Sequence, residues 1–205
     1  MEALVIDTPH GPARAHLRLA GRPAGALVLG HAAGGGVGAP DLVAAAQVAA
    51  EAGWTVALVE QPYRVAGRRA PAPAAQLDAA WTAVLACLAA GELRDLALVV
   101  GGRSSGARVA CRTAADTGAA AVLCLAFPLL PPARSPGRAA GASRQPELDA
   151  VVVPTLVVQG ANDPFGMPPP APERAVVAVP GDHRLAAGLP ELGAAVRVWL
   201  PTVVE

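Results

Sequence analysis

Short apolar runs alternate with longer alanine-rich segments along most of the chain. The runs are continuous and lack polar interruptions, which is typical of strands buried on both faces of a parallel sheet. They lie at residues 26–30, 55–59, 96–101, 120–127, 155–160 and 175–179. The alanine-rich segments predict helices at residues 41–52, 74–90, 105–117 and 191–200. This order predicts a doubly wound α/β fold, in which helices cover both faces of the sheet.

The N-terminal segment has a different pattern. Residues 4–7 are apolar, whereas residues 13–19 alternate between apolar and polar side chains. Because Pro9 and Pro12 mark a turn between these stretches, they predict an antiparallel hairpin with one polar face. There is no internal repeat or linker, so residues 1–205 are expected to form one domain.

One connection is longer than the others. Residues 127–145 are proline-rich where a helix would be expected, and loops beyond about 12–15 residues are usually functional. A chain of 205 residues also leaves little room for a separate cap domain. We therefore expect an uncapped, mostly parallel sheet whose pocket is made by this loop and by residues 60–69 and 165–172.

Composition excludes several kinds of chemistry. The 16 basic and 16 acidic residues balance, and every basic residue is an arginine. The lack of lysine excludes a P-loop, a Schiff-base lysine and a lysine general base. The net charge of zero gives no sign of a nucleic-acid partner. No spacing of cysteine and histidine resembles a metal site, so we expect neither a metal nor a cofactor.

Hydropathy and cysteine usage predict a cytoplasmic protein without a membrane partner. The mean hydropathy of +0.42 comes mostly from 49 alanines, and no apolar stretch reaches the ~20 residues of a membrane span. The N-terminus has neither a basic start nor the apolar core of a signal peptide. Cys87, Cys111 and Cys124 lie in apolar segments and are expected to be reduced.

The strongest local motif is Gly102-Arg103-Ser104-Ser105-Gly106, which follows a predicted strand and precedes a predicted helix. A nucleophile elbow has this setting, because its serine lies on a strained turn between small neighbours. The chain has only four serines, so a chance match is uncommon. The motif predicts Ser104 as a nucleophile; a plain glycine turn with a capping serine is the alternative.

A nucleophilic serine needs a base that is oriented by an acid. His183 is the only histidine after Ser104, and Asp163 follows the preceding strand. Both residues lie at the carboxyl ends of predicted strands, where parallel sheets place their sites. We predict Asp163 as the acid and His183 as the base, although each alone also fits a surface turn. Asp182 is too close to His183 to point back at its ring, and Asp149 precedes its strand.

A glycine-rich loop, His31-Ala32-Ala33-Gly34-Gly35-Gly36, follows the first parallel strand. Its backbone N–H groups are candidates to bind an oxyanion together with that of Ser105. We predict Ser105, Ala32 and Ala33 as the oxyanion hole, with a flexible turn as the alternative.

The same loop also fits a dinucleotide fingerprint, because residues 34–39 match G-x-G-x-x-A and Glu60 follows the next strand. Three residues separate the strand end from Gly34, however, and a preceding hairpin is unexpected in a Rossmann domain.

Four arginines have two possible roles. Arg103, Arg134, Arg138 and Arg144 either gather above Ser104 and favour an acidic substrate, or are solvated surface residues.

Several of these motifs together resemble one family, the small α/β-hydrolases often labelled dienelactone-hydrolase-like, which are found in bacteria and related to the testis-expressed-protein group in animals. The matching segments are Gly30-His31 with Gly34-Gly35-Gly36, residues 101–110 around the elbow, Phe127-Pro128-Leu129, residues 154–160 with Asp163-Pro164-Phe165-Gly166, and Gly181-Asp182-His183.

The resemblance implies an α/β-hydrolase fold with Ser104 as nucleophile, Asp163 as acid and His183 as base. Beside these we place His31, Arg103, Phe127 and Phe165 at the substrate. Two departures matter. Ala32 stands where the family usually has glycine, and dienelactone hydrolases proper use a cysteine in the elbow, so their substrate is not carried over.

The sequence thus predicts a serine hydrolase that cleaves an ester, thioester or related acyl bond of a small molecule. A non-catalytic binding or scaffold domain with the same fold is the alternative from another class, and a dinucleotide-binding protein is a third.

Overall fold

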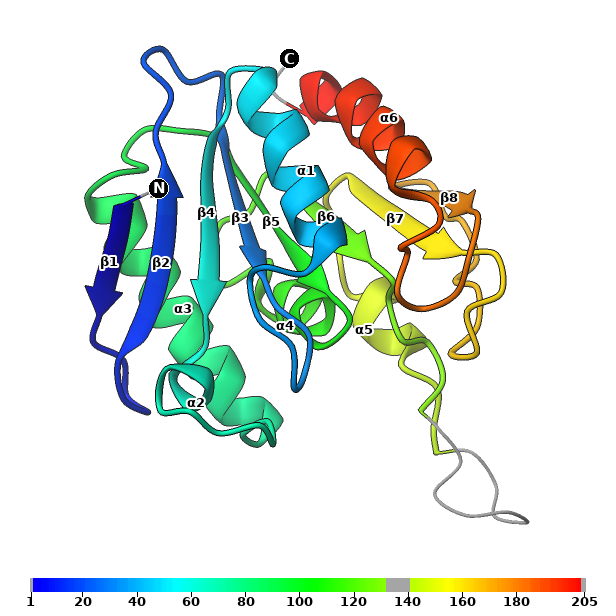
Figure 1. Cartoon of the computed structure of the whole chain (residues 1–205), viewed down its shortest axis with the longest axis horizontal. Coiled ribbons are helices and arrows are strands. Elements are labelled where there is room, and N and C mark those ends of the chain that lie inside the picture. Colours follow the sequence, from blue (N-terminus) through cyan, green and yellow to red (C-terminus); the bar gives the residue numbers. More distant parts are fainter. Residues whose placement is uncertain (1, 132–140, 204–205) are drawn as a thin grey trace.

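A computed structural model describes residues 2–131 and 141–203, and it contains one eight-stranded sheet (Figure 1). The spatial order of the strands is β1-β2-β4-β3-β5-β6-β7-β8. The strands are β1 (Glu2–Ile6), β2 (Ala13–Arg18), β3 (Ala26–Gly30), β4 (Thr55–Glu60), β5 (Leu98–Arg103), β6 (Ala121–Leu125), β7 (Thr155–Gly160) and β8 (Arg174–Val179). The helices are α1 (Pro40–Glu51), α2 (Pro62–Val65), α3 (Ala74–Ala90), α4 (Ser105–Thr113), α5 (Gln145–Asp149) and α6 (Leu189–Trp199), followed by a 3₁₀ turn at Leu200–Val203.

The predicted hairpin and parallel sheet are both confirmed. β1 pairs antiparallel with β2, and β2 pairs antiparallel with β4, so the hairpin extends one edge of the sheet. All pairings from β4 through β3 to β8 are parallel. The central strands β3, β6 and β7 are buried along their whole length, which explains why they read as continuous apolar runs.

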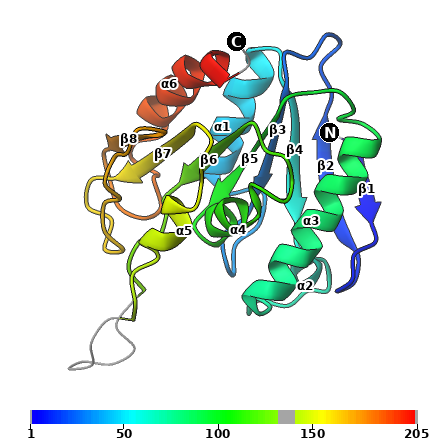
Figure 2. The same cartoon turned by 180° about the vertical axis from the view of Figure 1, so that it is seen from behind.

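Helices cover both faces of the sheet (Figures 1 and 2). On one face α1 and α6 pack against each other and supply Leu42, Leu192 and Val196 to the core. On the other face α3, α4 and α5 supply side chains that include Trp81 and Leu148. Within the described ranges no inserted cap domain is present, so the carboxyl ends of the strands are left to the connecting loops.

Two short helices were not predicted. Both α2 and α5 begin with a proline in their first turn, a position that a helix tolerates because its N–H has no intrahelical acceptor. A proline in the first turn is also typical of a loop, so the sequence pattern alone did not separate these short helices from loops. Residues 132–140, in the middle of the proline-rich connection, lie outside the described residues together with Arg134 and Arg138. Among the helices that the structure describes, none has the length and hydropathy needed to span a membrane.

Candidate active site

Ser104 occupies a sharp turn between β5 and α4. Its backbone has a φ of 53° and a ψ of −107°, which is a strained conformation for a residue with a side chain. The Ser104 N–H donates to the Leu125 carbonyl of β6 at 2.9 Å, and this bond helps to hold the turn. The strand–turn–helix setting expected from the motif is therefore present.

The glycines of the elbow are required by close packing against the end of β3. A Cβ atom built on Gly102 or on Gly106 would overlap the carbonyl oxygen of Gly30. Because both residues lack a side chain, α4 begins directly beside β3 and beside the loop that carries His31. The spacing G-x-S-x-G is thus explained by two backbone segments in contact.

His183 lies between Ser104 and Asp163. Its Nε2 is 3.0 Å from Ser104 Oγ, and its Nδ1 is 2.8 Å from Asp163 Oδ2. A carboxylate only accepts hydrogen bonds, so Nδ1 carries the proton and Nε2 is free to accept from the serine hydroxyl. Gly160 permits this approach, since a Cβ there would overlap the backbone of Asp182 in the histidine loop. Three residues from three different loops thus form one hydrogen-bonded series.

The Asp163 carboxylate is almost fully buried and accepts two further hydrogen bonds. The Phe165 N–H donates to Oδ1 at 2.9 Å, and the side-chain amide of Gln159 donates to Oδ2 at 2.8 Å. That amide nitrogen also lies 3.0 Å from the Phe127 carbonyl oxygen and 2.9 Å from that of Gly166. The sequence reasoning missed Gln159, although a lone amide inside an otherwise apolar strand was a usable signal.

The residues expected to supply backbone donors for an oxyanion lie at the start of α4 and in the loop after β3. The Ser105 N–H begins α4 and so has no acceptor within the helix. The N–H groups of Ala32 and Ala33 donate to no backbone carbonyl in the described part of the chain. Ser105 and Ala33 line a cavity with Ser104, and the volume of this cavity is about 290 Å³.

Of the four residues predicted to contact a substrate, only Phe165 lines this cavity, and its ring packs edge-on against His183 with centroids 4.4 Å apart. Phe127 is completely buried, so its side chain faces the core and only its carbonyl serves the site, through Gln159. Arg103 points the other way, toward α1. Its Nε lies 2.6 Å from Asp41 Oδ2, and an Nη atom donates to the His183 carbonyl at 3.0 Å.

His31 is also turned inward and is 3% exposed. Its Nδ1 donates to the Ala32 carbonyl at 2.9 Å, and its Nε2 accepts from the Gln61 N–H at 3.1 Å. Both ring nitrogens are therefore occupied by the backbone. His31 fixes the loop after β3 to the loop after β4, a positioning task in place of the predicted substrate contact.

A family model described as an alpha/beta hydrolase domain matches residues 23–177 of the chain. The chain belongs to this alpha/beta hydrolase family. The matched region contains Ser104 and Asp163 and ends six positions before His183. No curated protein sequence matches the hydrolase.

Solved structures share the fold at low sequence identity. A serine hydrolase without a lid from Xanthomonas campestris is 20% identical, with a TM-score of 0.74 over 98% of this hydrolase and 94% of that chain. Est1E from Butyrivibrio proteoclasticus is 16% identical, with a TM-score of 0.78 over 100% and 99% of the two chains. A dienelactone hydrolase from Anabaena variabilis is 16% identical, with a TM-score of 0.75 over 98% and 96%.

The dinucleotide reading of the glycine-rich loop finds no support at Glu60. This carboxylate accepts from His16 Nε2 at 3.0 Å and lies 3.4 Å from an Nη atom of Arg14, so it is bound to β2.

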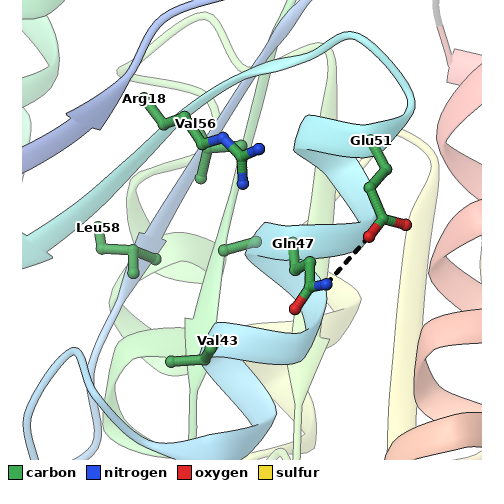
Figure 3. Close-up of a pocket in the computed structure, with 7 residues that line it drawn as sticks. Arg18, Val43, Gln47, Glu51, Val56 and Leu58 are labelled. Carbon is green, nitrogen blue, oxygen red and sulfur yellow. Dashed lines mark hydrogen bonds between the residues drawn. The ribbon is translucent and has the colours of Figure 1, made fainter. Parts of the chain in front are cut away.

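A second hollow of the hydrolase, about 420 Å³ in volume, lies between α1 and the strands β2 and β4 (Figure 3). Its polar lining includes Gln47, whose amide donates to Glu51 at 3.0 Å.

We expect His31 to make the hydrolase less stable in mild acid. Burial lowers the pKa of His31 below its usual 6.5. The unfolded chain therefore binds a proton near pH 6.5 that the folded chain takes up only at lower pH, and stability falls as the pH drops through this window. The slope is at most about 1.4 kcal/mol per pH unit.

Urea denaturation of wild type and His31→Gln between pH 7.5 and 5.5 measures this effect. The variant should lose less stability over that interval, whereas parallel pH dependences for the two proteins would contradict the prediction.

Proposed function

We propose that this hydrolase cleaves an ester, thioester or related acyl bond of a small molecule, with Ser104 as the nucleophile. The observation that carries the proposal is the hydrogen-bonded series Ser104–His183–Asp163, whose Ser104 lines a cavity. A serine hydroxyl is a weak nucleophile, and a neutral imidazole within hydrogen-bond reach is what activates it.

In the proposed first half-reaction, Ser104 Oγ attacks the carbonyl carbon while its proton passes to His183 Nε2. The charge of Asp163 stabilises the imidazolium and keeps the ring in the orientation it has at rest. The new oxyanion accepts hydrogen bonds from the N–H groups of Ser105 and of Ala32 or Ala33. Collapse of the tetrahedral intermediate breaks the bond to the leaving group, which takes the proton from His183.

In the second half-reaction, water attacks the acyl group on Ser104, and His183 takes the proton from that water. The tetrahedral intermediate forms on the same donors and then expels Ser104 Oγ, which recovers its proton from His183. The products are a carboxylic acid and an alcohol or thiol, and the hydrolase returns to its starting state.

A fluorophosphonate probe tests the proposal, because it forms a covalent bond only with an activated serine. We expect wild type and a Ser143→Ala control to be labelled and Ser104→Ala to remain unlabelled. In Ser104→Ala, kcat for hydrolysis of a simple 4-nitrophenyl ester should fall by a factor of roughly 10⁴ or more. Equal labelling of wild type and Ser104→Ala would refute the assignment. A wild type that neither reacts nor turns over would favour the scaffold alternative.

A further inference from the structure

Three arginines are among the residues that line the cavity with Ser104. Arg108 and Arg112 come from α4, on the face that also presents Ser105, and Arg144 comes from the residue before α5. The chain as a whole has a formal net charge of zero. What each group is paired with decides whether the cavity itself is charged.

Two of the three guanidinium groups are neutralised by bidentate ion pairs. Arg108 donates to both oxygens of Glu147, at 2.8 Å and 2.5 Å. Arg112 donates to both oxygens of Asp78, at 2.8 Å and 2.6 Å, and lies 3.4 Å from Glu147. These pairs fix the geometry of the arginines and hold α4 to α3 and α5.

Arg144 differs, because no ion pair joins it to a carboxylate within residues 2–131 and 141–203. One of its Nη atoms donates to the Pro128 carbonyl at 2.8 Å. Burial lowers the pKa of Arg144, and Arg108 and Arg112 lower it further against the opposing charge of Glu147. The guanidinium is nonetheless a strong enough base to remain charged at neutral pH. Among the residues that the structure describes, these three cations and their two carboxylate partners leave one positive charge in excess at the cavity.

The cavity also has apolar lining residues, namely Pro71, Ala72, Ala74 and Leu77. A ligand that fills the cavity therefore meets Ser104, apolar side chains and the uncompensated Arg144 guanidinium. One surplus positive charge matches a monoanion such as a carboxylate better than a phosphate monoester, whose charge is close to −2 at neutral pH.

We propose that the substrate carries a carboxylate, apart from the bond to be cleaved, and that Arg144 binds it. This inference rests on the proposed hydrolase function and adds the substrate class. Arg108 and Arg112 support the site because they hold Glu147 and Asp78 in ion pairs of their own.

A matched pair of substrates tests the proposal. The 4-nitrophenyl monoester of glutaric acid carries a free carboxylate, and the corresponding ester with a terminal primary amide has the same shape without the charge. We expect Arg144→Gln to lower kcat/KM for the carboxylate ester by roughly 10- to 100-fold. The amide ester should change by less than about 2-fold, because it makes no charged contact. Arg22→Gln, which removes an exposed arginine elsewhere, serves as the control and should change neither value.

A second pair, with the carboxylate or amide on the alcohol part, shows which end of the substrate Arg144 binds. A charge preference that depends on Arg144 in either pair supports the proposal. Equal effects of Arg144→Gln on the charged and neutral members of both pairs would overturn it.

Binding to the Ser104→Ala variant separates this proposal from the proposed chemistry. There the carboxylate ester should raise the melting temperature more than the amide ester, and adding Arg144→Gln should remove the difference. If this difference appears while wild type cleaves neither ester, the chemistry fails and the anion site stands. If wild type cleaves both equally well and binding shows no preference, the anion site fails and the chemistry stands.

Discussion

Replacing Asp163 with asparagine is expected to reduce kcat for ester hydrolysis by roughly 10⁴-fold while the fold persists. The carboxylate accepts from three donors, namely His183 Nδ1, the Gln159 amide and the Phe165 N–H. An asparagine amide cannot accept from all of them, because one of its two terminal atoms is itself a donor. With its NH₂ group toward His183, the ring would be driven to the tautomer that carries the proton on Nε2, and that nitrogen could no longer accept the proton of Ser104.

Asp182→Asn is the matched control, since Asp182 neighbours His183 in sequence but is exposed and accepts from the Arg184 N–H. An asparagine side-chain oxygen preserves that bond, so activity should stay within about 2-fold of wild type. Steady-state kinetics on a neutral 4-nitrophenyl ester, with circular dichroism to verify folding, measure both variants. Full activity of Asp163→Asn, or a comparable loss in Asp182→Asn, would show that another residue orients His183.

Replacing Arg103 with methionine is expected to cost about 3–5 kcal/mol of folding free energy, the largest stability effect we predict. Asp41 is fully buried at the start of α1, and Arg103 Nε lies 2.6 Å from its carboxylate. Burial already raises the pKa of Asp41, and the positive charge of Arg103 counteracts that rise. Without the guanidinium, a carboxylate remains in the core with no cation beside it.

The cost should depend on pH. A carboxyl group whose folded-state pKa is raised binds a proton more readily in the folded chain than in the unfolded chain, so the loss shrinks as the pH falls through that raised pKa. The double variant Asp41→Asn/Arg103→Met removes both charges and should recover most of the stability, because the asparagine still accepts from the Leu42 N–H. Urea denaturation of wild type and both variants provides the measurement. A single variant within about 0.5 kcal/mol of wild type would contradict the account.

The sheet was predictable because its burial is nearly complete. Strands β3, β6 and β7 are covered on both faces, and such strands appear in the sequence as short continuous apolar runs. The short helices α2 and α5 were missed because a proline in the first turn signals a loop and a helix start equally well. The predicted helix at 105–117 ends at Thr113, where Thr113 Oγ1 bonds back to the Val109 carbonyl.

The candidate site was predictable where a local motif encodes backbone geometry, as in the elbow and in the loops that carry Asp163 and His183. Side-chain direction was not encoded in this way. His31 and Phe127 follow strands in the expected places, yet both side chains are buried and neither lines the cavity beside Ser104. The partners of Arg103, Arg108 and Arg112 are separated from them by 34 or more positions in sequence, and no spacing rule links such residues.

The helix α4 has a consequence for substrate length. It starts immediately after Ser104 and carries Arg108 one turn further on, and the pair between Arg108 and Glu147 ties that turn to the segment that bears Arg144. An α-helix rises 1.5 Å per residue, so the Cα atom of Arg108 stands about 6 Å further along the helix axis than that of Ser104. Because the backbone of a helix is rigid, Ser104 and the Arg108 backbone keep this offset, and a substrate that binds as proposed has to match a fixed distance between its cleaved bond and its carboxylate.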